Sequence, residues 1–286
     1  MAKEHCFVIC AYQNSPYLEE CILSLKRQKL SSPSVILLYT STPCREVREV
    51  ADKYDIPMQI GESGKGGAGI AADWNGALNA AREQGVRYVT LAHQDDAYEP
   101  DYAECMIKAL QDAETLGERP QIAFTDYYEI RKSGRMSENT NLRIKQVLLT
   151  PLKSRLLRHA TWAKRMAICL GNAICCPSVT YVLPNLEQYS DEGSSDCRDL
   201  NLFHGTMGSN IDWQLWEELS RERGSFLYIS KQLMGHRIHE NSTTSELIHD
   251  ESRRKEDLYM LEKFWPKRIA EGIEHFYQRA ERSNGM

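Results

Sequence analysis

Two adjacent carboxylates provide the first candidate site in this sequence. Asp95 and Asp96 directly follow an apolar run, Arg87 to Ala92, that predicts a strand. Because neighbouring like charges are unfavourable unless a cation or hydrogen-bond donors compensate them, a divalent metal is a natural partner. Hard oxygen ligands suit Mg²⁺ or Mn²⁺, and either ion would neutralise a bound pyrophosphate. The alternative is a helix-capping turn in which one carboxylate caps and the other is solvated.

A third acid, Asp212, stands in the segment SNIDWQLW, where Ser209 or Asn210 can cap a helix. An acid in the first turn of a helix complements the macrodipole, so a purely structural role is one interpretation. The other is chemical, since a carboxylate fixed at a helix start can take a proton from a hydroxyl group.

Three histidines accompany these acids. His236 and His239 lie in GHRIHENS, which we expect to be a loop after a strand. They could be surface residues, or either could ligate a metal held by the acids. His93, just before the acids, is expected to be a packed neighbour.

A glycine-rich segment adds a second type of candidate site. Gly64, Gly66 and Gly69 satisfy G-x-G-x-x-G between a predicted strand and a helix. A dinucleotide fingerprint normally belongs to the first β-α turn, whereas this segment follows the third strand. An NAD(P)-binding oxidoreductase therefore stays open as an alternative. A turn that exposes backbone N–H groups would equally serve another phosphate-bearing ligand.

The first hundred residues must position these groups, and they alternate short apolar strands with amphipathic helices. This pattern is typical of β-α-β units and predicts an α/β fold with a Rossmann-like, mostly parallel central sheet flanked by helices. Predicted strands cover 5–11, 35–39, 58–60 and 87–92, with helices starting at Pro16, near Pro43 and at Ala71. Open α/β sheets bind ligands beyond the carboxyl ends of their strands, which is where the acids stand.

The second half of the chain is less regular. A basic stretch from Arg143 to Arg165 precedes the segment GNAICCPSVTYVLPNL, a helix near Ser209, the strand FLYIS and the loop MGHRIHENSTT. The basic stretch could meet a phosphate-bearing partner or form a solvated helix face. Apolar residues at helical spacing within 246–286 predict a C-terminal helical extension.

Composition limits the classes of function. The chain has 286 residues, 42% apolar and 26% charged, with a net charge of −5, so a nucleic-acid partner is disfavoured. No apolar run reaches the length of a transmembrane helix or secretory signal. Nine scattered cysteines without a C-x-x-C pair indicate reduced core residues. We therefore expect a cytoplasmic protein.

Four segments together resemble the inverting glycosyltransferases of family 2, which have the GT-A fold. FVICAYQNSPYLEECILSLKRQ resembles the signature whose turn touches the nucleotide, and GGAGIAADWNGALNAAREQGVRYVTLAHQDDAYEPDY resembles the segment leading into the D-x-D-type motif. SNIDWQLW resembles the helix start bearing the catalytic base, and HRIHENST resembles the R-x-H loop that closes over the donor. The segments occur in the order of the family and cover roughly residues 5 to 245.

The resemblance implies a role for each matching position. Asp212 would be the catalytic base, and Asp96 with His239 would hold Mn²⁺ or Mg²⁺, while Asp95 would contact the ribose. The implied nucleotide-sugar contacts are Ala11, Tyr12, Asn14, Gly66, Gly67, Asp73, Gln94 and Asp95. The implied reaction is one displacement: an acceptor hydroxyl attacks and inverts the anomeric carbon, and a nucleoside diphosphate departs.

The same resemblance divides the chain into three parts. Residues 1–125 would be the nucleotide-sugar-binding half of a single GT-A domain, 126–245 the acceptor-binding and catalytic half, and 246–286 the helical extension. The acceptor would be a glycan or another hydroxyl compound, as in cell-surface polysaccharide biosynthesis, bound between GNAICCPSVTY and the helix near Ser209. The location would be cytoplasmic, at the inner face of a membrane. A non-catalytic relative that binds nucleotide or glycan is a further alternative.

The sequence also departs from the family at three places. Gln94 stands where many members have the first acid of the motif, and Ile211 replaces a frequent Glu before the catalytic acid. The turn after the second strand reads TSTP and lacks the Asp often found near the base. The identity of the nucleotide is therefore open.

Overall fold

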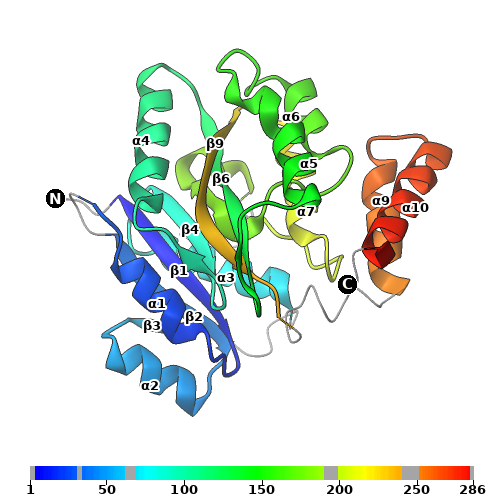
Figure 1. The fold of residues 1–286 in the computed structure, drawn as a ribbon. Coiled ribbons are helices and arrows are strands. Elements are labelled where there is room, and N and C mark those ends of the chain that lie inside the picture. Colours follow the sequence, from blue (N-terminus) through cyan, green and yellow to red (C-terminus); the bar gives the residue numbers. More distant parts are fainter. Residues whose placement is uncertain (1–3, 31–33, 62–68, 190–198, 240–250, 284–286) are drawn as a thin grey trace.

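One mixed sheet organises the chain. The computed structural model describes residues 4–30, 34–61, 69–189, 199–239 and 251–283. Within these residues the strands are β1 (His5–Tyr12), β2 (Val35–Thr42), β3 (Met58–Ile60), β4 (Tyr88–His93), β5 (Ala97–Tyr98), β6 (Pro120–Arg131), β7 (Gly134–Met136), β8 (Val179–Val182) and β9 (Ser225–Arg237). Their order is β3-β2-β1-β4-β8-β6-β9-β5, with β7 paired to β6 (Figure 1).

Strand directions show how far the sheet is parallel. The pairs β1–β2, β1–β4, β2–β3 and β6–β9 are parallel. Strand β8 runs antiparallel between β4 and β6, while β5 and β7 run antiparallel at edges. Six strands thus point one way and three the other, which confirms the predicted α/β fold with a mostly parallel sheet.

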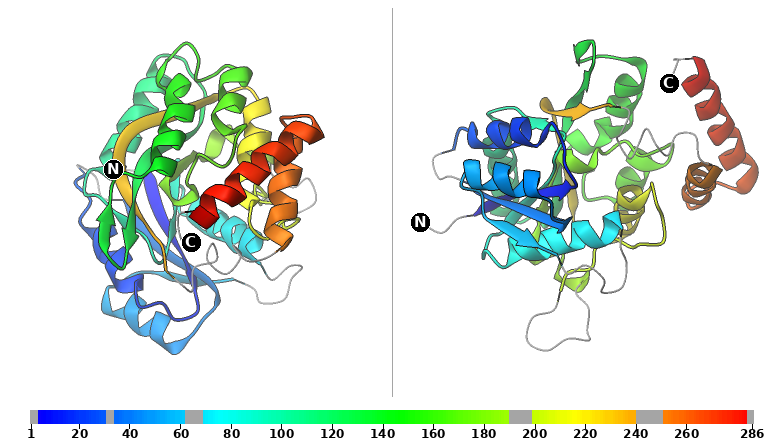
Figure 2. Two further views of the ribbon diagram at one scale, coloured as in Figure 1. Left: turned by 45° about the vertical axis from the view of Figure 1, so that its right-hand side comes forward. Right: turned by 90° about the horizontal axis from the view of Figure 1, so that it is seen from below.

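Helices cover both faces of this sheet. They are α1 (Leu18–Lys26), α2 (Arg45–Lys53), α3 (Ile70–Arg82), α4 (Tyr102–Thr115), α5 (Thr140–Leu149), α6 (Thr161–Ile168), α7 (Ile211–Arg221), α9 (Glu251–Glu262) and α10 (Lys267–Ser283), with short 3₁₀ turns η1 (Thr150–Lys153), η2 (Cys176–Ser178), η3 (Leu183–Asn185) and η4 (Glu187–Tyr189). Helices α1, α2 and α4 share one core layer, and α3, α6 and α7 share the other. The predicted C-terminal helices α9 and α10 lie together beside α7 (Figures 1 and 2).

Strand β1 illustrates why the sheet forms. Cys6 and Val8 face one core layer, Phe7 and Ile9 face the other, and all four side chains are fully buried. Successive side chains of a strand point to opposite faces, so a run that is apolar at every position is stable only between two helical layers. The carboxyl end of β1 is thereby fixed at the edge where the candidate site lies.

Two predicted helix starts are displaced. Helix α1 begins at Leu18 rather than Pro16, because the Ser15 hydroxyl accepts the N–H of Tyr17 within the preceding turn and does not cap the helix. Helix α2 begins at Arg45, two residues after Pro43, and has no side-chain cap.

Strand β9 extends well beyond the predicted FLYIS. The residues Met234 to Arg237, expected in a loop, continue the strand because Met234 and Gly235 pair with β5 and the segment also pairs with β6. The partner strands β5 and β6 are more than a hundred residues away in sequence, and pairing with them makes this segment a strand. The prediction of a loop here is therefore wrong.

The basic stretch is only in part a solvated helix face. It forms α5, η1 and α6, and Lys164 within it is fully buried. The Lys164 ammonium donates to the carbonyls of Glu222 at 2.6 Å and Gly224 at 3.0 Å, and burial lowers its pKa to about 8. This lysine anchors the turn between α7 and β9.

Candidate active site

The ends of β4 and β9 bring the predicted acids and histidines together. Asp96 is 1% exposed, and its Oδ1 accepts the backbone N–H of Arg237 at 2.9 Å and lies 3.2 Å from His236 Nδ1. Asp95 Oδ2 lies 2.9 Å from His239 Nε2. Each of the two acids thus lies within hydrogen-bond distance of a different histidine at the end of β9.

The charge of Asp96 is controlled by these neighbours. Burial alone would raise its pKa, but the charge and hydrogen bond of His236, with His93 and the Arg237 N–H, hold it below its ordinary value. Burial would conversely lower the pKa of His236, and Asp96 raises it. Asp96 is therefore kept as a buried carboxylate anion.

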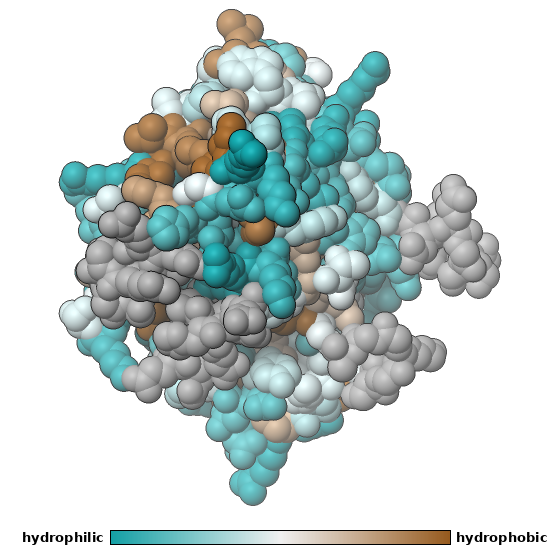
Figure 3. Space-filling view, turned by 90° about the vertical axis from the view of Figure 1, so that its right-hand side faces the viewer, coloured by the Kyte–Doolittle hydropathy of each residue, from teal (hydrophilic) through white to brown (hydrophobic). Residues whose placement is uncertain are grey.

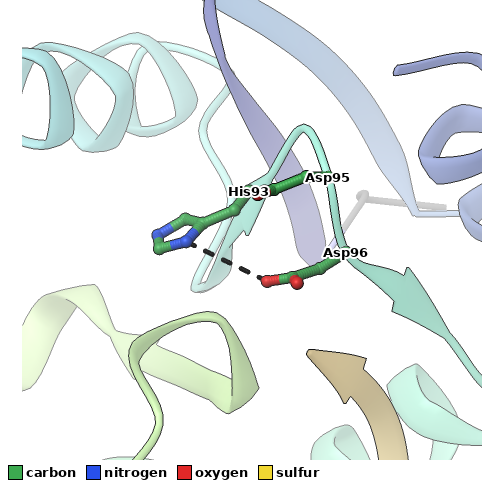
Figure 4. A group of neighbouring side chains, drawn as sticks. All are labelled: His93, Asp95 and Asp96. Carbon is green, nitrogen blue, oxygen red and sulfur yellow. Dashed lines mark ion pairs between the residues drawn. The ribbon is translucent and has the colours of Figure 1, made fainter. Parts of the chain in front are cut away.

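One oxygen of this buried anion is free to bind a ligand. Among the described residues, Asp96 Oδ2 has no hydrogen-bond partner, and its nearest ion-pair neighbour is His93 Nδ1 at 3.9 Å. Figure 4 shows the His93 ring directed toward Asp96. Ligand atoms of His93, Asp95 and Asp96 all lie within 4.8 Å of one another. A buried oxygen left open is costly, so this group fits a divalent cation.

His239, the expected second ligand, contacts Asp95 rather than Asp96. His93, expected to be only a packed neighbour, stacks on Trp74 with ring centroids 5.2 Å apart while its Nδ1 faces Asp96. Its Nε2 is buried without a hydrogen-bond partner among the described residues. His93 is thus both packed and placed among the candidate ligands.

Arg237 braces the end of β9 against α1. Its Nε donates to the Asp95 carbonyl at 2.8 Å, and its guanidinium pairs with Glu20 at 2.7 Å and lies over the Tyr17 ring at 4.3 Å. The His239 ring also packs on Tyr17, with centroids 5.1 Å apart. The start of α1 therefore holds the R-x-H segment next to the acids.

The turn after β1 is held by its neighbours. The Gln94 amide donates to the Tyr12 carbonyl at 2.9 Å and accepts the Tyr12 N–H at 3.1 Å, and Thr42 Oγ1 accepts the N–H of Gln13 at 3.0 Å. Gln94, expected to contact the nucleotide, thus ties the ends of β1 and β4 together. Tyr12, 57% exposed, and Asn14 remain open to a ligand.

The other expected nucleotide contacts differ in their exposure and in whether the structure describes them. Ala11 is buried at the end of β1. Asp73 lies in the first turn of α3, where burial raises its pKa against a hydrogen bond with Ser41 that lowers it. Gly66 and Gly67 lie outside the described residues.

Asp212 occupies the first turn of α7, as predicted. Its Oδ2 accepts from Asn172 Nδ2 at 2.7 Å and its Oδ1 accepts the N–H of Trp213 at 2.9 Å. Burial raises its pKa, although these hydrogen bonds and the charges of His93 and Lys145 act in the opposite direction. A helix start favours the charge of an acid in its first turn, but here burial outweighs that effect. The charge of His93 favours the ionised form of both Asp96 and Asp212.

Two residues near Asp212 were missed by the sequence analysis. Asn172 comes from the irregular GNAICC segment, and its Oδ1 is buried with no hydrogen-bond partner in the described part of the chain. Lys145 turns inward from α5 and donates to the Tyr127 hydroxyl at 3.0 Å. The irregularity of the first segment was a usable signal, whereas Lys145 is indistinguishable in sequence from its solvated neighbours.

A polar cavity of about 290 Å³ opens beside α5. Its lining residues are Asp126, Ser137, Glu138, Leu142, Arg143, Gln146, Ser230 and Gln232. A smaller hollow shares Asp126 and Gln146 with it and reaches Lys145 and Ala173, the residue after Asn172. The two hollows thus adjoin each other along α5, and Asp212 lines neither of them.

The C-terminal helices support the helix that bears Asp212. The Glu256 carboxylate of α9 accepts the N–H groups of Gly208 at 2.7 Å, Ser209 at 2.9 Å and Asn210 at 3.3 Å. The predicted caps Ser209 and Asn210 make no side-chain cap; Asn210 Nδ2 instead donates to Asp257 at 2.7 Å. Burial raises the pKa of Glu256, but these hydrogen bonds lower it overall.

Comparison with known proteins places these features in a family. The model of glycosyl transferase family 2 matches residues 6–169, more than half of the chain. The uncharacterized glycosyltransferase EpsJ of Bacillus subtilis (strain 168) is 26% identical over 155 residues, which are 54% of this chain and 42% of that protein. The chain thus aligns with less than half the length of this relative.

Solved structures show the same fold. The mannosyltransferase PcManGT from Pyrobaculum calidifontis, in complex with GDP-Man and Mn²⁺, has a TM-score of 0.61 at 13% identity, covering all of this chain and 77% of that one. S. aureus TarS 1-349, in complex with UDP-GlcNAc, has a TM-score of 0.59 at 12% identity, covering 98% and 73%. At these identities the similarity establishes the GT-A fold alone.

The family match also decides between the classes of function left open by the sequence. It leaves the dinucleotide oxidoreductase without support. None of the helices in the described ranges is long and apolar enough to cross a bilayer. The chain is therefore a member of glycosyltransferase family 2 and has the GT-A fold.

Proposed function

We propose that this enzyme transfers a sugar from a nucleoside-diphosphate sugar to a hydroxyl acceptor, with inversion and with a divalent metal. The observation that carries the proposal is the buried Asp96 carboxylate, whose Oδ2 has no hydrogen-bond partner among the described residues and which forms, with His93 and Asp95, a group of ligand atoms within 4.8 Å of one another. The pKa of Asp96 is lowered and that of Asp212 is raised. Acids whose surroundings separate their pKa values in this way suit one for binding a cation and the other for accepting a proton.

The metal ligands proposed are Asp96 and His239, with Asp95 and His93 close enough to complete or support the set. Oxygen and imidazole ligands suit Mn²⁺, and Mg²⁺ is the alternative. The ion would neutralise the charge of the departing diphosphate. The Mn²⁺ and GDP-Man bound by PcManGT are in line with this assignment.

The donor would lie across the carboxyl ends of β1 and β4. Tyr12 offers an exposed ring face for stacking on a base, and Asp95 would accept from a ribose hydroxyl. Asn14 and Asp73, with the backbone at Gly66 and Gly67, are the other proposed contacts, and Ala11 places the turn. Gln94 would act through Tyr12, whose backbone it holds.

Asp212 is the proposed general base. Its carboxylate would take the proton of the acceptor hydroxyl, whose oxygen attacks the anomeric carbon as the bond to the diphosphate oxygen breaks. Asn172 would orient the carboxylate through its hydrogen bond. The acceptor would lie between the 171–181 segment and α7, and the cavity beside α5 is its proposed approach.

The wider assignments remain part of this proposal. Residues 1–125 would bind the nucleotide sugar, 126–245 the acceptor, and 246–286 would form a supporting extension. A cytoplasmic location at the inner face of a membrane, and a glycan acceptor of a cell-surface polysaccharide, complete it. The eight cysteines within the described ranges form no disulfide, which suits a reducing compartment.

Thermal-shift measurements with nucleoside diphosphates, with and without Mn²⁺ or Mg²⁺, test the proposal. We expect one diphosphate to raise the melting temperature only when metal is present. Release of sugar from the matching donor then separates an enzyme from a non-catalytic binding protein. Equal stabilisation with and without metal would contradict metal dependence, and stabilisation without any turnover would favour the non-catalytic alternative.

A further inference from the structure

The surface formed by α5, η1 and α6 differs in charge from the rest of the chain. Residues 139–186 contain seven Lys or Arg and no Asp or Glu. The whole chain has 35 basic and 40 acidic residues, which leaves 28 against 40 outside this segment. A basic segment in an acidic protein creates a local field that attracts anions.

The same segment exposes large apolar side chains. They are Ile144 (42% exposed), Val147 (71%), Leu156 (80%), Trp162 (57%) and Met166 (49%). Ile144 and Val147 share one side of α5, and Trp162 and Met166 share one side of α6, because they are three and four residues apart. These five are nearly half of the twelve exposed large hydrophobics in the described residues. Figure 3 shows apolar side chains gathered toward the top of the molecule, where α5 and α6 lie.

Exposed basic side chains lie among these apolar ones. Arg143, Lys153 and Arg155 are exposed on α5, η1 and the following turn. Arg143 pairs with Glu138 and Arg155 with Glu118, while Lys153 lies over the Tyr228 ring at 5.6 Å. Their long aliphatic stems allow the charged ends to reach beyond an apolar surface.

We propose that this surface, called here the α5–α6 face and defined by the five apolar side chains above with Arg143, Lys153 and Arg155, docks the enzyme on an anionic lipid bilayer. Protruding aliphatic and Trp side chains beside basic ones are the pattern of a helix that lies in a membrane interface. Charge complementarity selects the occupant: although Glu138 and Glu118 pair with Arg143 and Arg155, residues 139–186 contribute no acid, and a bilayer rich in anionic headgroups supplies the opposite charge.

The α5–α6 face lies next to the cavity beside α5, so docking would affect where the acceptor enters. Leu142, Arg143 and Gln146 of α5 line the cavity that is the proposed approach of the acceptor, and Lys145 of the same helix lines the smaller hollow beside it. Docking would therefore hold the acceptor side of the site next to the bilayer. The inference deepens the membrane location given under the proposed function, and its test does not depend on the proposed reaction.

Co-sedimentation of the full chain with vesicles tests it. We expect binding to vesicles of phosphatidylcholine with phosphatidylglycerol, little binding to phosphatidylcholine alone, and weaker binding as salt rises. Leu156→Glu and Val147→Glu should each weaken binding about tenfold or more, because burying such a side chain is worth at least the ~1.4 kcal/mol that corresponds to tenfold. Leu23→Glu makes the same chemical change on α1, in the opposite layer, and should leave binding unchanged.

Melting curves with and without nucleoside diphosphate establish that each variant is folded. Equal binding to neutral and anionic vesicles would overturn the electrostatic part of the proposal. Binding that Leu156→Glu and Leu23→Glu reduce equally would overturn the choice of face. Absence of vesicle binding, together with self-association or protein capture that Leu156→Glu abolishes, would show that the face binds protein instead.

Discussion

Two buried acids of this enzyme are held in opposite ways. Asp96, at the end of a regular strand, is surrounded by donors: the Arg237 N–H at 2.9 Å and His236 at 3.2 Å keep its pKa low. Asp212 lies at the start of α7 and accepts hydrogen bonds from Asn172, which belongs to an irregular segment, and from the Trp213 N–H. These two donors do not offset burial, which raises the pKa of Asp212.

The comparison separates two requirements of a transferase site. An acid that binds a cation must stay ionised in the absence of the ion, and paired donors achieve this. An acid that accepts a proton gains from surroundings that disfavour its charge. The type of residue is the same in both places, so the neighbours decide the role.

The strongest test of the comparison removes the proposed base. Asp212→Asn keeps the size of the side chain but cannot accept a proton, so we expect kcat to fall about 10²- to 10⁴-fold with metal-dependent donor binding retained. Steady-state transfer rates and thermal shifts with nucleoside diphosphate provide the measurement. Near-normal turnover with a slightly lowered melting temperature would show that Asp212 only complements the helix dipole.

The second test removes the acid that we propose as the principal metal ligand. Asp96→Asn can still accept the Arg237 N–H but carries no charge, so the stabilisation by metal and nucleoside diphosphate should be lost. At a hundredfold excess of ligand over Kd, that stabilisation is about 2.7 kcal/mol in the unmodified enzyme. Thermal shift with Mn²⁺ measures it. If the full metal-dependent shift survived in a folded variant, Asp96 would not be the principal ligand.

The third test perturbs Asp212 through its partner. Asn172→Ala deletes a donor to the ionised carboxylate, which raises the pKa of Asp212 further, so the acid limb of the kcat profile should move to higher pH. Loss of orientation should also lower kcat about tenfold, as expected for a hydrogen bond to a charged group.

Asn185→Ala is the matched control for this variant, because Asn185 donates to the Pro120 carbonyl at 2.7 Å away from the site. We expect it to leave the position of the acid limb unchanged. An identical limb in both variants would mean that Asn172 does not act on Asp212.

The smallest effect is expected at the C-terminal helix. Glu256→Gln weakens the acceptor of three N–H groups before α7, and loss of a capping group costs about 0.5 to 2 kcal/mol. We expect a melting temperature lower by a few degrees and a kcat reduced less than tenfold. Glu274→Gln, which loses a pair with Arg254 within the extension, is the control and should leave kcat unchanged.

The regular first half of the chain could be predicted because its signals are local. Strands predicted over 35–39 and 87–92 appear as Val35–Thr42 and Tyr88–His93. In the second half, the start of α7 was predicted from an equally local signal, and Asp212 lies in its first turn as expected. Alternation of apolar segments and helices determines these elements within short windows.

The remainder depended on partners far away in sequence. Met234 to Arg237 form strand only against β5 and β6, and Lys164 is buried only because carbonyls near Gly224 surround it. The cap of α7 comes from Glu256, about 45 residues beyond it. No local sequence pattern predicts such contacts. The neighbours that lower the pKa of Asp96 and those that surround Asp212 could therefore not be predicted from the sequence.

The pairing of β5 with β9 has a consequence for the order of folding. The two residues of β5 lie at the sheet edge and, within the described residues, pair only with β9, and the Arg237 N–H that binds Asp96 is 141 residues further along the chain. During synthesis the N-terminal β-α-β units can assemble first, because their contacts are local. Asp96 lacks its Arg237 hydrogen bond until most of the remaining chain has been synthesised. A growing chain should therefore acquire the proposed metal affinity late, in one step, when β9 enters the sheet.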